Sequence, residues 1–176
     1  FISGLVPSNN ATDATNDLDF TIVVAADLSN DEFIELLTAM TKRADAAWAE
    51  GTNQGMLDTG AVADTTYHVY LIKNRKSGKV DILSSTSASA PTMPSGYTLK
   101  RRIFSFVRIA VANQVFTAYE KSGGGLYTEL KVPVRNFQTA NPGINAVTWT
   151  TSAPLGVKFN VKVNFSSGAA YNVGFD

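Results

Sequence analysis

Apolar residues at every second position are the feature that most limits what this chain can fold into. They are clearest in residues 158–165, where Phe and Val alternate with Lys and Asn. Residues 102–111 alternate in a similar way, and residues 67–72 carry apolar side chains on both faces. Successive side chains of a strand point to opposite faces, so this period indicates half-buried strands. The segment 67–72 is expected to be a central strand.

Turn-forming segments between these runs predict how the strands connect. Residues 74–78 turn the chain from the strand at 67–72 into a partner at 80–83, and residues 113–114 form a tight hairpin before 115–119. A Ser-, Ala- and Pro-rich loop covers residues 85–99, and further strands are predicted at 1–5, 18–24, 126–134 and 171–175. About nine or ten short strands joined by turns predict a mainly β fold, an antiparallel and jelly-roll-like β-sandwich or barrel.

One segment departs from this alternation and predicts an amphipathic helix near residues 31–50. Its apolar positions follow helical spacing and form one stripe. Ser29 and Glu32 fit a capping box, and Gly51 fits a C-terminal stop. We expect about five helical turns docked on the sheet, with Trp48 in the core. The stripe consists of Phe33, Leu36, Leu37, Met40, Ala44, Ala47 and Trp48.

The composition fits one folded domain. The chain has 176 residues, of which 44% are hydrophobic and 17% charged. That is enough apolar material to bury a core and too much for a disordered chain. We expect a single β-sandwich domain over residues 1–176 that includes the helix at 31–50. Because both ends read as strands, we also expect the chain to be part of a longer polypeptide, or its ends to lie outside the ordered part.

Charge and cysteine content exclude several classes of partner and site. Fifteen basic residues balance fifteen acidic ones, so no general attraction to nucleic acid or to an anionic membrane is expected. Neutrality also removes repulsion between copies, which suits a protein that assembles. There is no cysteine, hence no disulfide, thiolate metal site or cysteine nucleophile. The sequence has no run of about 18 apolar residues, so it predicts no membrane-spanning helix.

Two groups of residues invite a catalytic or metal-binding interpretation. His68 is the only histidine, so a catalytic triad or a zinc site would have to use it. It lies within a predicted strand with no nucleophile motif beside it, and a packed or hydrogen-bonded structural histidine is favoured. An acidic N-terminal segment could offer oxygen ligands to calcium, but it lacks the Gly and Glu of an EF-hand, so a turn-rich loop is favoured. Its polar residues are Asn9, Asn10, Asp13, Asn16, Asp17 and Asp19.

Basic and aromatic residues are the remaining candidates for a ligand site. Lys100, Arg101 and Arg102 follow the Pro-containing loop and could contact a phosphate or an acidic glycan, although a solvated strand entrance is favoured. Trp149 is the better candidate for an exposed aromatic that stacks on a sugar ring. No carboxylate pair for glycoside hydrolysis singles itself out. We therefore predict no catalytic residue, metal or cofactor. Other basic residues are Lys73, Arg75, Lys76 and Lys79.

Several short motifs occur in a fixed order along the first two thirds of the chain. They occupy residues 8–13, 41–48, 57–60, 65–72, 78–86, 88–97 and 100–103. This series, which spans about residues 4–118, resembles a module of tail-fibre-like and other structural proteins of tailed bacteriophages and prophages. Phe104 stands where the module usually has a small residue.

The resemblance implies a virion structural protein and not an enzyme. Such a protein would be a fibre, tail-tip or capsid-attached fibre component that acts in assembly and host-surface adsorption. Its partners would be copies of itself in a trimer, other virion proteins and a host-surface glycan, with neither nucleic acid nor membrane insertion. The alternatives are a free-standing carbohydrate-binding module and a capsule-depolymerising enzyme. Assembly predicts an apolar or strand-edge face that is shared between copies. A lectin predicts an exposed aromatic groove, and an enzyme predicts a cleft with a perturbed carboxylate pair.

Overall fold

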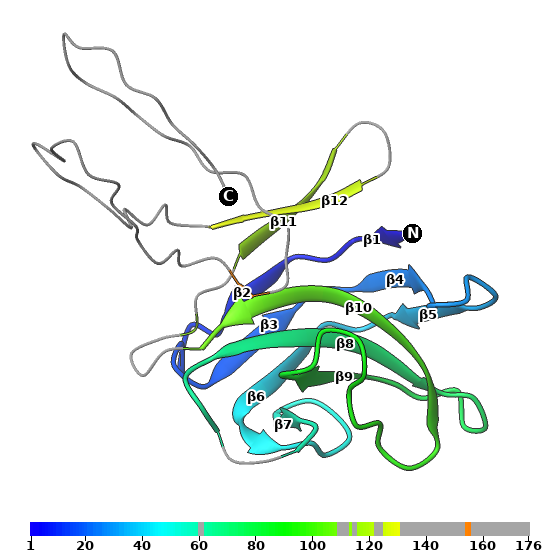
Figure 1. The fold of residues 1–176 in the computed structure, drawn as a ribbon, viewed down its shortest axis with the longest axis horizontal. Helices are drawn as coiled ribbons and strands as arrows, with labels where there is room; N and C mark the ends of the chain where they lie inside the picture. Colours follow the sequence, from blue (N-terminus) through cyan, green and yellow to red (C-terminus); the bar gives the residue numbers. More distant parts are fainter. Residues whose placement is uncertain (60–61, 109–112, 114–115, 122–124, 131–153, 156–176) are drawn as a thin grey trace, which may run out of the picture.

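Strands make up the regular secondary structure of the described part of the chain (Figure 1). The computed structural model describes residues 1–59, 62–108, 113, 116–121, 125–130 and 154–155. The mainly β character predicted from the alternation is confirmed for these residues. The strands are β1 Ile2–Ser3, β2 Pro7–Asn9, β3 Asp17–Phe20, β4 Val23–Ala26, β5 Phe33–Leu36, β6 Met40–Ala47, β7 Gln54–Leu57, β8 Thr66–Asn74, β9 Val80–Ser85, β10 Tyr97–Val107, β11 Phe116–Lys121 and β12 Gly125–Leu130.

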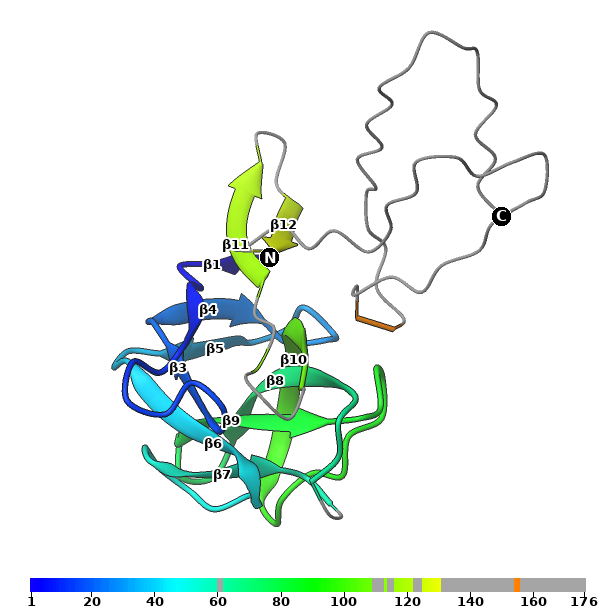
Figure 2. The ribbon, with the colours of Figure 1, turned by 90° about the vertical axis from the view of Figure 1, so that its left-hand side faces the viewer.

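The strands form one large sheet, one small sheet and a two-stranded ribbon. The seven-stranded sheet has the order β10-β8-β9-β7-β6-β3-β2, and the three-stranded sheet the order β1-β4-β5. Neighbours are antiparallel except at β7, which is parallel to both β6 and β9. Figure 2 shows the small sheet lying along one side of the curled large sheet. β10 is an edge strand, paired in its sheet with β8.

A shared hydrophobic core fills the space between the two sheets. Leu18 of β3, Ile34 of β5 and Leu71 of β8 are all buried in it. Burial of one such side chain contributes about 1.5–3 kcal/mol. On its other face, β8 carries Tyr70 and Ile72 into a second buried cluster. The central strand predicted at residues 67–72 is therefore confirmed, and its apolar residues on both faces are explained by two separate clusters.

Phe104, which stands where the resembling module usually has a small residue, is part of the shared core. Its ring stacks on Phe106 with centroids 5.9 Å apart and meets Phe20 edge-on at 6.1 Å. The strand pairing shifts register between Arg102 and Phe104, next to this ring. The large side chain is thus accommodated by packing across the interior of the curled large sheet, from β10 to β3.

The helix predicted near residues 31–50 is wrong, because this segment forms β5 and β6. β5 pairs with β4, and β6 pairs with β3, both in antiparallel register. The predicted stripe combined residues that point in opposite directions: Leu36 is buried, whereas Phe33 and Leu37 are exposed. Trp48, which was expected in the core, follows β6 and is half-buried against Tyr97, with ring centroids 5.2 Å apart.

A charged residue at a core position hid the strand pattern. Ile34 and Leu36 of β5 face the core, and Lys42 and Ala44 of β6 are fully buried. A search for apolar periodicity does not register a buried lysine, so the alternation in β6 is invisible in the sequence. The pairing of β6 with both β3 and β7 outweighs the helix propensity of its residues.

The predicted capping box is instead a loop that Asp27 organises between β4 and β5. The Asp27 carboxylate accepts hydrogen bonds from Oγ of Ser29 at 2.5 Å and from the backbone N–H groups of Asp31 at 2.9 Å and Glu32 at 3.2 Å. The Ser29 hydroxyl is the largest cause that lowers the pKa of Asp27 from 3.8 to about 2, against the opposing effect of burial. The ionised carboxylate is therefore the form that holds the loop.

We expect Asp27→Asn to remove part of the acid sensitivity of folding. Because the folded-state pKa of Asp27 lies below its ordinary value, its stabilisation is complete above that value and is lost as the pH falls toward about 2. Urea unfolding should show the unmodified protein more stable than Asp27→Asn at neutral pH, with the difference shrinking between about pH 4 and 2. Asp31→Asn, whose side chain is exposed, is the control. A difference that stays constant over this range would contradict the assignment.

Candidate functional site

A hollow at the outer edge of the large sheet is lined in part by two arginine side chains from one strand. Arg101 and Arg102 come from β10, and Tyr70 comes from the neighbouring β8. The remaining residues belong to the loops that follow β4 and β9. The hollow has a volume of about 350 Å³. We call it the arginine groove, and it is lined by Leu28, Tyr70, Ala88, Ser89, Arg101 and Arg102.

Two loops attached to β10 form the walls of the groove. The backbone N–H of Leu28 donates to the carbonyl oxygen of Lys100 at 3.2 Å, which holds the loop after β4 along the edge strand. On the other side, Nη1 of Arg102 donates to the carbonyl oxygen of Ala88 at 3.0 Å. The Ser-, Ala- and Pro-rich segment predicted as a loop therefore contributes one wall of the groove.

Both arginines keep most of their hydrogen-bonding capacity. They are half-buried, and Arg101 donates to the carbonyl oxygen of Asp27 at 3.4 Å, a long contact, while Arg102 donates to Ala88. A guanidinium has five N–H donors, so several remain on each side chain. Within the described residues, no carboxylate forms an ion pair with either guanidinium. The positive charge of the groove is therefore not neutralised there.

The other residues of the groove are neutral. The Tyr70 ring is buried, and its hydroxyl donates to the carbonyl oxygen of Ser87 at 2.8 Å. Burial is the main cause that raises the pKa of Tyr70, which keeps the phenol protonated. Leu28 is 54% exposed and provides an apolar wall. Ser89 makes no side-chain hydrogen bond within the part of the chain that the structure describes, so its hydroxyl is available to a ligand.

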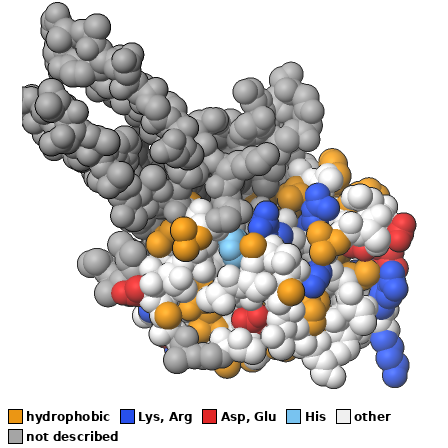
Figure 3. All heavy atoms as spheres, in the orientation of Figure 1, with side chains coloured by type: hydrophobic (Ala, Val, Ile, Leu, Met, Phe, Trp, Pro, Cys, Tyr) orange, Lys and Arg blue, Asp and Glu red, His pale blue; other side chains and the backbone are white. Residues whose placement is uncertain are grey.

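This set of groups suits the binding of an anion. A planar guanidinium binds a carboxylate or a phosphate through two parallel hydrogen bonds. The groove contains one serine but neither a histidine nor a carboxylate that could activate it. Figure 3 shows Lys and Arg side chains interspersed with hydrophobic ones over the face that β10 crosses. The arrangement combines positive charge with apolar surface.

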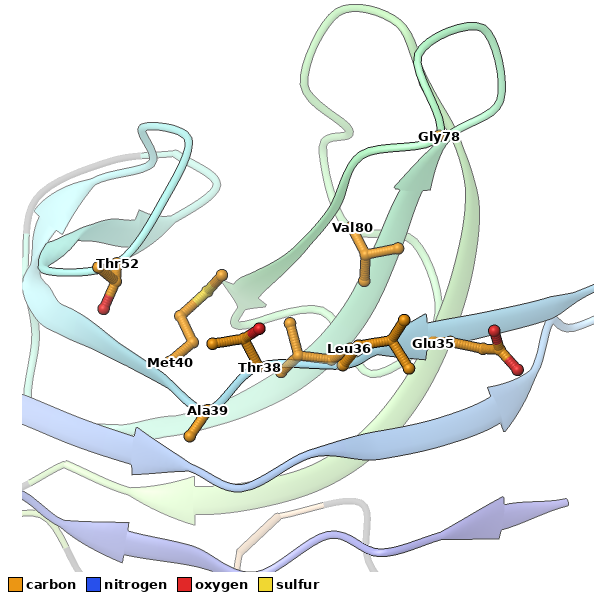
Figure 4. Close-up of a pocket in the computed structure, with 9 residues that line it drawn as sticks. Glu35, Leu36, Thr38, Ala39, Met40, Thr52, Gly78 and Val80 are labelled. Atoms are coloured by element: carbon orange, nitrogen blue, oxygen red, sulfur yellow. The ribbon is translucent and has the colours of Figure 1, made fainter.

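A second hollow, of about 380 Å³, lies where β5 connects to β6 (Figure 4). The side chains of Leu36, Met40 and Val80 point toward one another across it, and Thr52 lies at its margin. Glu35 is its sole charged lining residue, and that carboxylate points away from the apolar group. These residues can receive an apolar side chain, but they offer few groups that would orient a polar ligand.

His68 lies in β8 and is buried. Its Nδ1 lies 2.8 Å from Oγ of Ser105 in β10, a hydrogen bond across the strand pair. Burial is the main cause that lowers the pKa of His68, and Arg102 acts in the same direction. The neutral imidazole is thus the favoured form. This geometry agrees with a packed and hydrogen-bonded histidine; the absence of a catalytic role stays a prediction.

The acidic N-terminal residues form a hydrogen-bonded turn between β2 and β3. Asp13 accepts bonds from the backbone N–H of Asn16 at 3.0 Å and from its side chain at 3.1 Å, which lower the pKa of Asp13. Asp19 accepts from Asn10 at 3.0 Å and from Thr41 at 2.7 Å. Among the described residues, no His, Asp and Glu side chains gather in a group of three that could hold a metal ion. The turn interpretation is favoured.

The remaining basic candidates are engaged or lie apart from the groove. Lys73 and Arg75 both pair with Glu32, at 3.7 Å and 2.8 Å, and Lys79 pairs with Glu50. Trp149 lies outside the described residues. The structure therefore brings together Arg101 and Arg102 from the predicted basic run but not the other basic positions.

Sequence reasoning missed a buried ion pair between β6 and β9. Nζ of Lys42 lies 2.9 Å from Oδ1 of Asp81, and both side chains are at most 1% exposed. Lys42 also donates to the carbonyl oxygens of Ala49 at 2.8 Å and Gly51 at 3.0 Å. The backbone N–H of Gly51 donates to Oδ2 of Asp81 at 2.7 Å. Gly51, which was expected to end a helix, instead has a φ of 102° and completes this network.

The ion pair is structural, because each polar group already has partners. Three acceptors surround the Lys42 ammonium, and Asp81 additionally accepts from the backbone N–H of Ile82 at 2.6 Å. The network attaches the connection after β6 to the large sheet. In the sequence, the one sign of this ion pair was a lysine two positions before Ala44, in a segment where inward and outward positions alternate. That sign is too weak to identify the pair.

Comparison with known proteins adds no assignment, since no family model, curated protein or solved structure matches the chain. No stretch of the described residues forms a helix suited to crossing a membrane.

Proposed function

We propose that the chain is a structural module of a tailed-phage virion, a fibre or tail-tip component that acts in assembly and host-surface adsorption. The ordered motifs that resemble such modules support this proposal. The described parts of these motifs lie in β2 to β10 and the loops between them. The curled large sheet and the small sheet around one core support an antiparallel β-sandwich or barrel as the architecture.

The observation that carries the assembly part of the proposal is an apolar surface on the small sheet. Phe1 and Phe33 are 65% and 56% exposed, and their rings contact each other edge-on at 5.9 Å. Ile22 and Leu37 are 56% and 75% exposed at the other end of the pairing between β4 and β5. We call these four residues the apolar face. Large exposed apolar side chains gathered at both ends of one strand pair favour an interaction site.

A second copy of the chain is the proposed occupant of the apolar face. The chain has no net charge that would keep copies apart. β5 also lies at the edge of its sheet, where strands commonly meet another chain. The number of three copies comes from the resemblance to fibre proteins, in which cyclic closure hides equivalent edges.

We expect the full-length polypeptide to be a trimer in solution at tens of micromolar, and Phe33→Ser with Leu37→Ser to weaken association roughly tenfold or more. The exchange removes apolar surface from the apolar face without adding charge. Sedimentation velocity over a range of concentrations up to tens of micromolar measures the effect. Lys76→Ser, on the exposed turn between β8 and β9, is the control. A monodisperse monomer of the unmodified protein would contradict the assembly proposal.

A free-standing carbohydrate-binding module is the second candidate, and the arginine groove is the observation that favours it. The groove is open, partly apolar and lined by half-buried donors, although its aromatic residue, Tyr70, is buried and not exposed as a lectin groove predicts. The two proposals separate on oligomeric state, because the fibre proposal requires assembly and a free-standing module does not. For a depolymerase, the described residues provide no comparable observation.

A further inference from the structure

We propose that the arginine groove binds the carboxylate of an acidic sugar. This goes further than the proposed function by naming the class of ligand, and it rests on that function only for the source of the sugar. Arg101 and Arg102 supply N–H donors that no described carboxylate uses. Two unpaired guanidinium groups beside one hollow favour an anion with planar oxygen pairs.

The uncharged residues of the groove favour a sugar over a simple inorganic anion. The exposed Leu28 side chain and Ala88 offer aliphatic contact to the C–H groups of a pyranose ring. The Ser89 hydroxyl can exchange hydrogen bonds with ring hydroxyls. A volume of about 350 Å³ is large enough for one sugar residue in an open site. An inorganic phosphate would use the arginines alone.

The same walls argue against nucleic acid. Recognition of single-stranded nucleic acid uses exposed aromatic rings on which bases stack. The aromatic residue of the groove, Tyr70, is only 1% exposed, and its hydroxyl is bound to Ser87. The ring therefore supports the floor of the groove and offers no stacking surface. Aliphatic walls and hydroxyl groups match a carboxylated sugar better than a base.

The position of the groove also suits a polymeric ligand. Among the described strands, β10 is the edge of its sheet, so none of them covers the groove from that side. An acidic residue within a longer glycan can therefore enter from this side while its neighbours stay outside the groove. One residue held in an open site gives weak affinity, with a Kd of about a millimolar.

The test measures binding of acidic sugars to the full chain by ligand-observed NMR. The probes are glucuronate, galacturonate and N-acetylneuraminate, each beside its methyl ester, which keeps the shape and removes the charge. At least one acid should bind at tens of millimolar or below, and its ester should bind at least about tenfold more weakly. Inorganic phosphate is a separate competitor. Thermal unfolding of each variant confirms that it folds.

Arg101→Gln and Arg102→Gln should each raise the Kd for the acid at least about fivefold, and the double change should abolish detectable binding. Arg75→Gln makes the same change in net charge at an exposed arginine already paired with Glu32, and should leave binding unchanged. Leu28→Ser, which leaves both guanidinium groups in place, should weaken the sugar but not phosphate.

Four results would overturn the inference. Equal binding of acid and ester would show that the charge is not recognised. An equal loss in Arg75→Gln would show a general charge effect. Failure of all three acids to bind, or phosphate binding as tightly as the sugars, would remove the acidic-sugar site. Oligomeric mass measured on the same samples reports separately on the assembly proposal, so either proposal can fail alone.

Discussion

Asp81→Asn is expected to destabilise the protein by about 3–5 kcal/mol, because it leaves the Lys42 ammonium buried without its carboxylate. Both side chains are at most 1% exposed, so water cannot replace the lost partner. The carbonyl oxygens of Ala49 and Gly51 still accept from Lys42, but neither carries a compensating charge. Chemical denaturation monitored by Trp48, which lies beside Lys42, measures the loss.

Two further variants separate the ion pair from general effects of the substitution. Asp45→Asn removes the carboxylate of the exposed pair with Arg43, and it should cost no more than about 1 kcal/mol. Lys42→Met combined with Asp81→Asn removes both buried charges and should be more stable than Asp81→Asn alone. A loss below about 1 kcal/mol for Asp81→Asn would mean that the site admits water and that the pair is not desolvated.

The sequence alone predicted those strands in which apolar side chains recur at every second position. The turn at residues 74–78 and the hairpin on either side of it appear as β8 and β9. The predicted strand at 18–24 is in fact two, since β3 and β4 belong to different sheets. The predicted hairpin at 113–114 falls largely outside the described residues, and its expected second strand, β11, pairs with β12. The local sequence pattern identified extended segments, but contacts between residues far apart in the sequence decided which strands pair.

Predictions failed where a core position is polar or where an outward position is apolar. Lys42 occupies an inward position of β6 because Asp81, remote in the sequence, neutralises it. Phe33 and Leu37 point outward and therefore imitated a helical stripe. The predictions at 158–165 and 171–175 lie outside the described residues.

The arginine groove was only half visible in the sequence. Arg101 and Arg102 were identified from their charge, but Leu28 lies in a loop more than seventy positions earlier and carries no polar motif. Its approach to β10 depends on a backbone hydrogen bond to Lys100, which no side-chain pattern encodes. Tyr70 was predicted only to be part of a central strand. A site on a sheet edge is assembled by pairing and loop placement, so its composition follows from the fold.

Gly55→Ala is expected to destabilise the protein by about 3 kcal/mol or more, because β7 passes too close to the end of β6 for any side chain. A Cβ atom at Gly55 would lie 2.0 Å from the carbonyl oxygen of Ala47 and 2.5 Å from that of Ala46. These are backbone atoms, so relief requires displacement of a strand and not rotation of a side chain. The pairing of β6 with β7 also carries the connection that Lys42 holds.

Gly78→Ala is the matched control, since it makes the same change at a glycine where an added Cβ atom would meet nothing within 4 Å outside the two adjacent residues. Its φ of 74° lies in the left-handed region, so alanine there should cost only about 1–2 kcal/mol of backbone strain. Denaturant unfolding of the two variants under one set of conditions compares the effects. If both variants lost the same stability, the backbone of β7 at Gly55 would have to lie farther from β6 than the structure shows. Glycine at position 55 would then be required only for its backbone conformation.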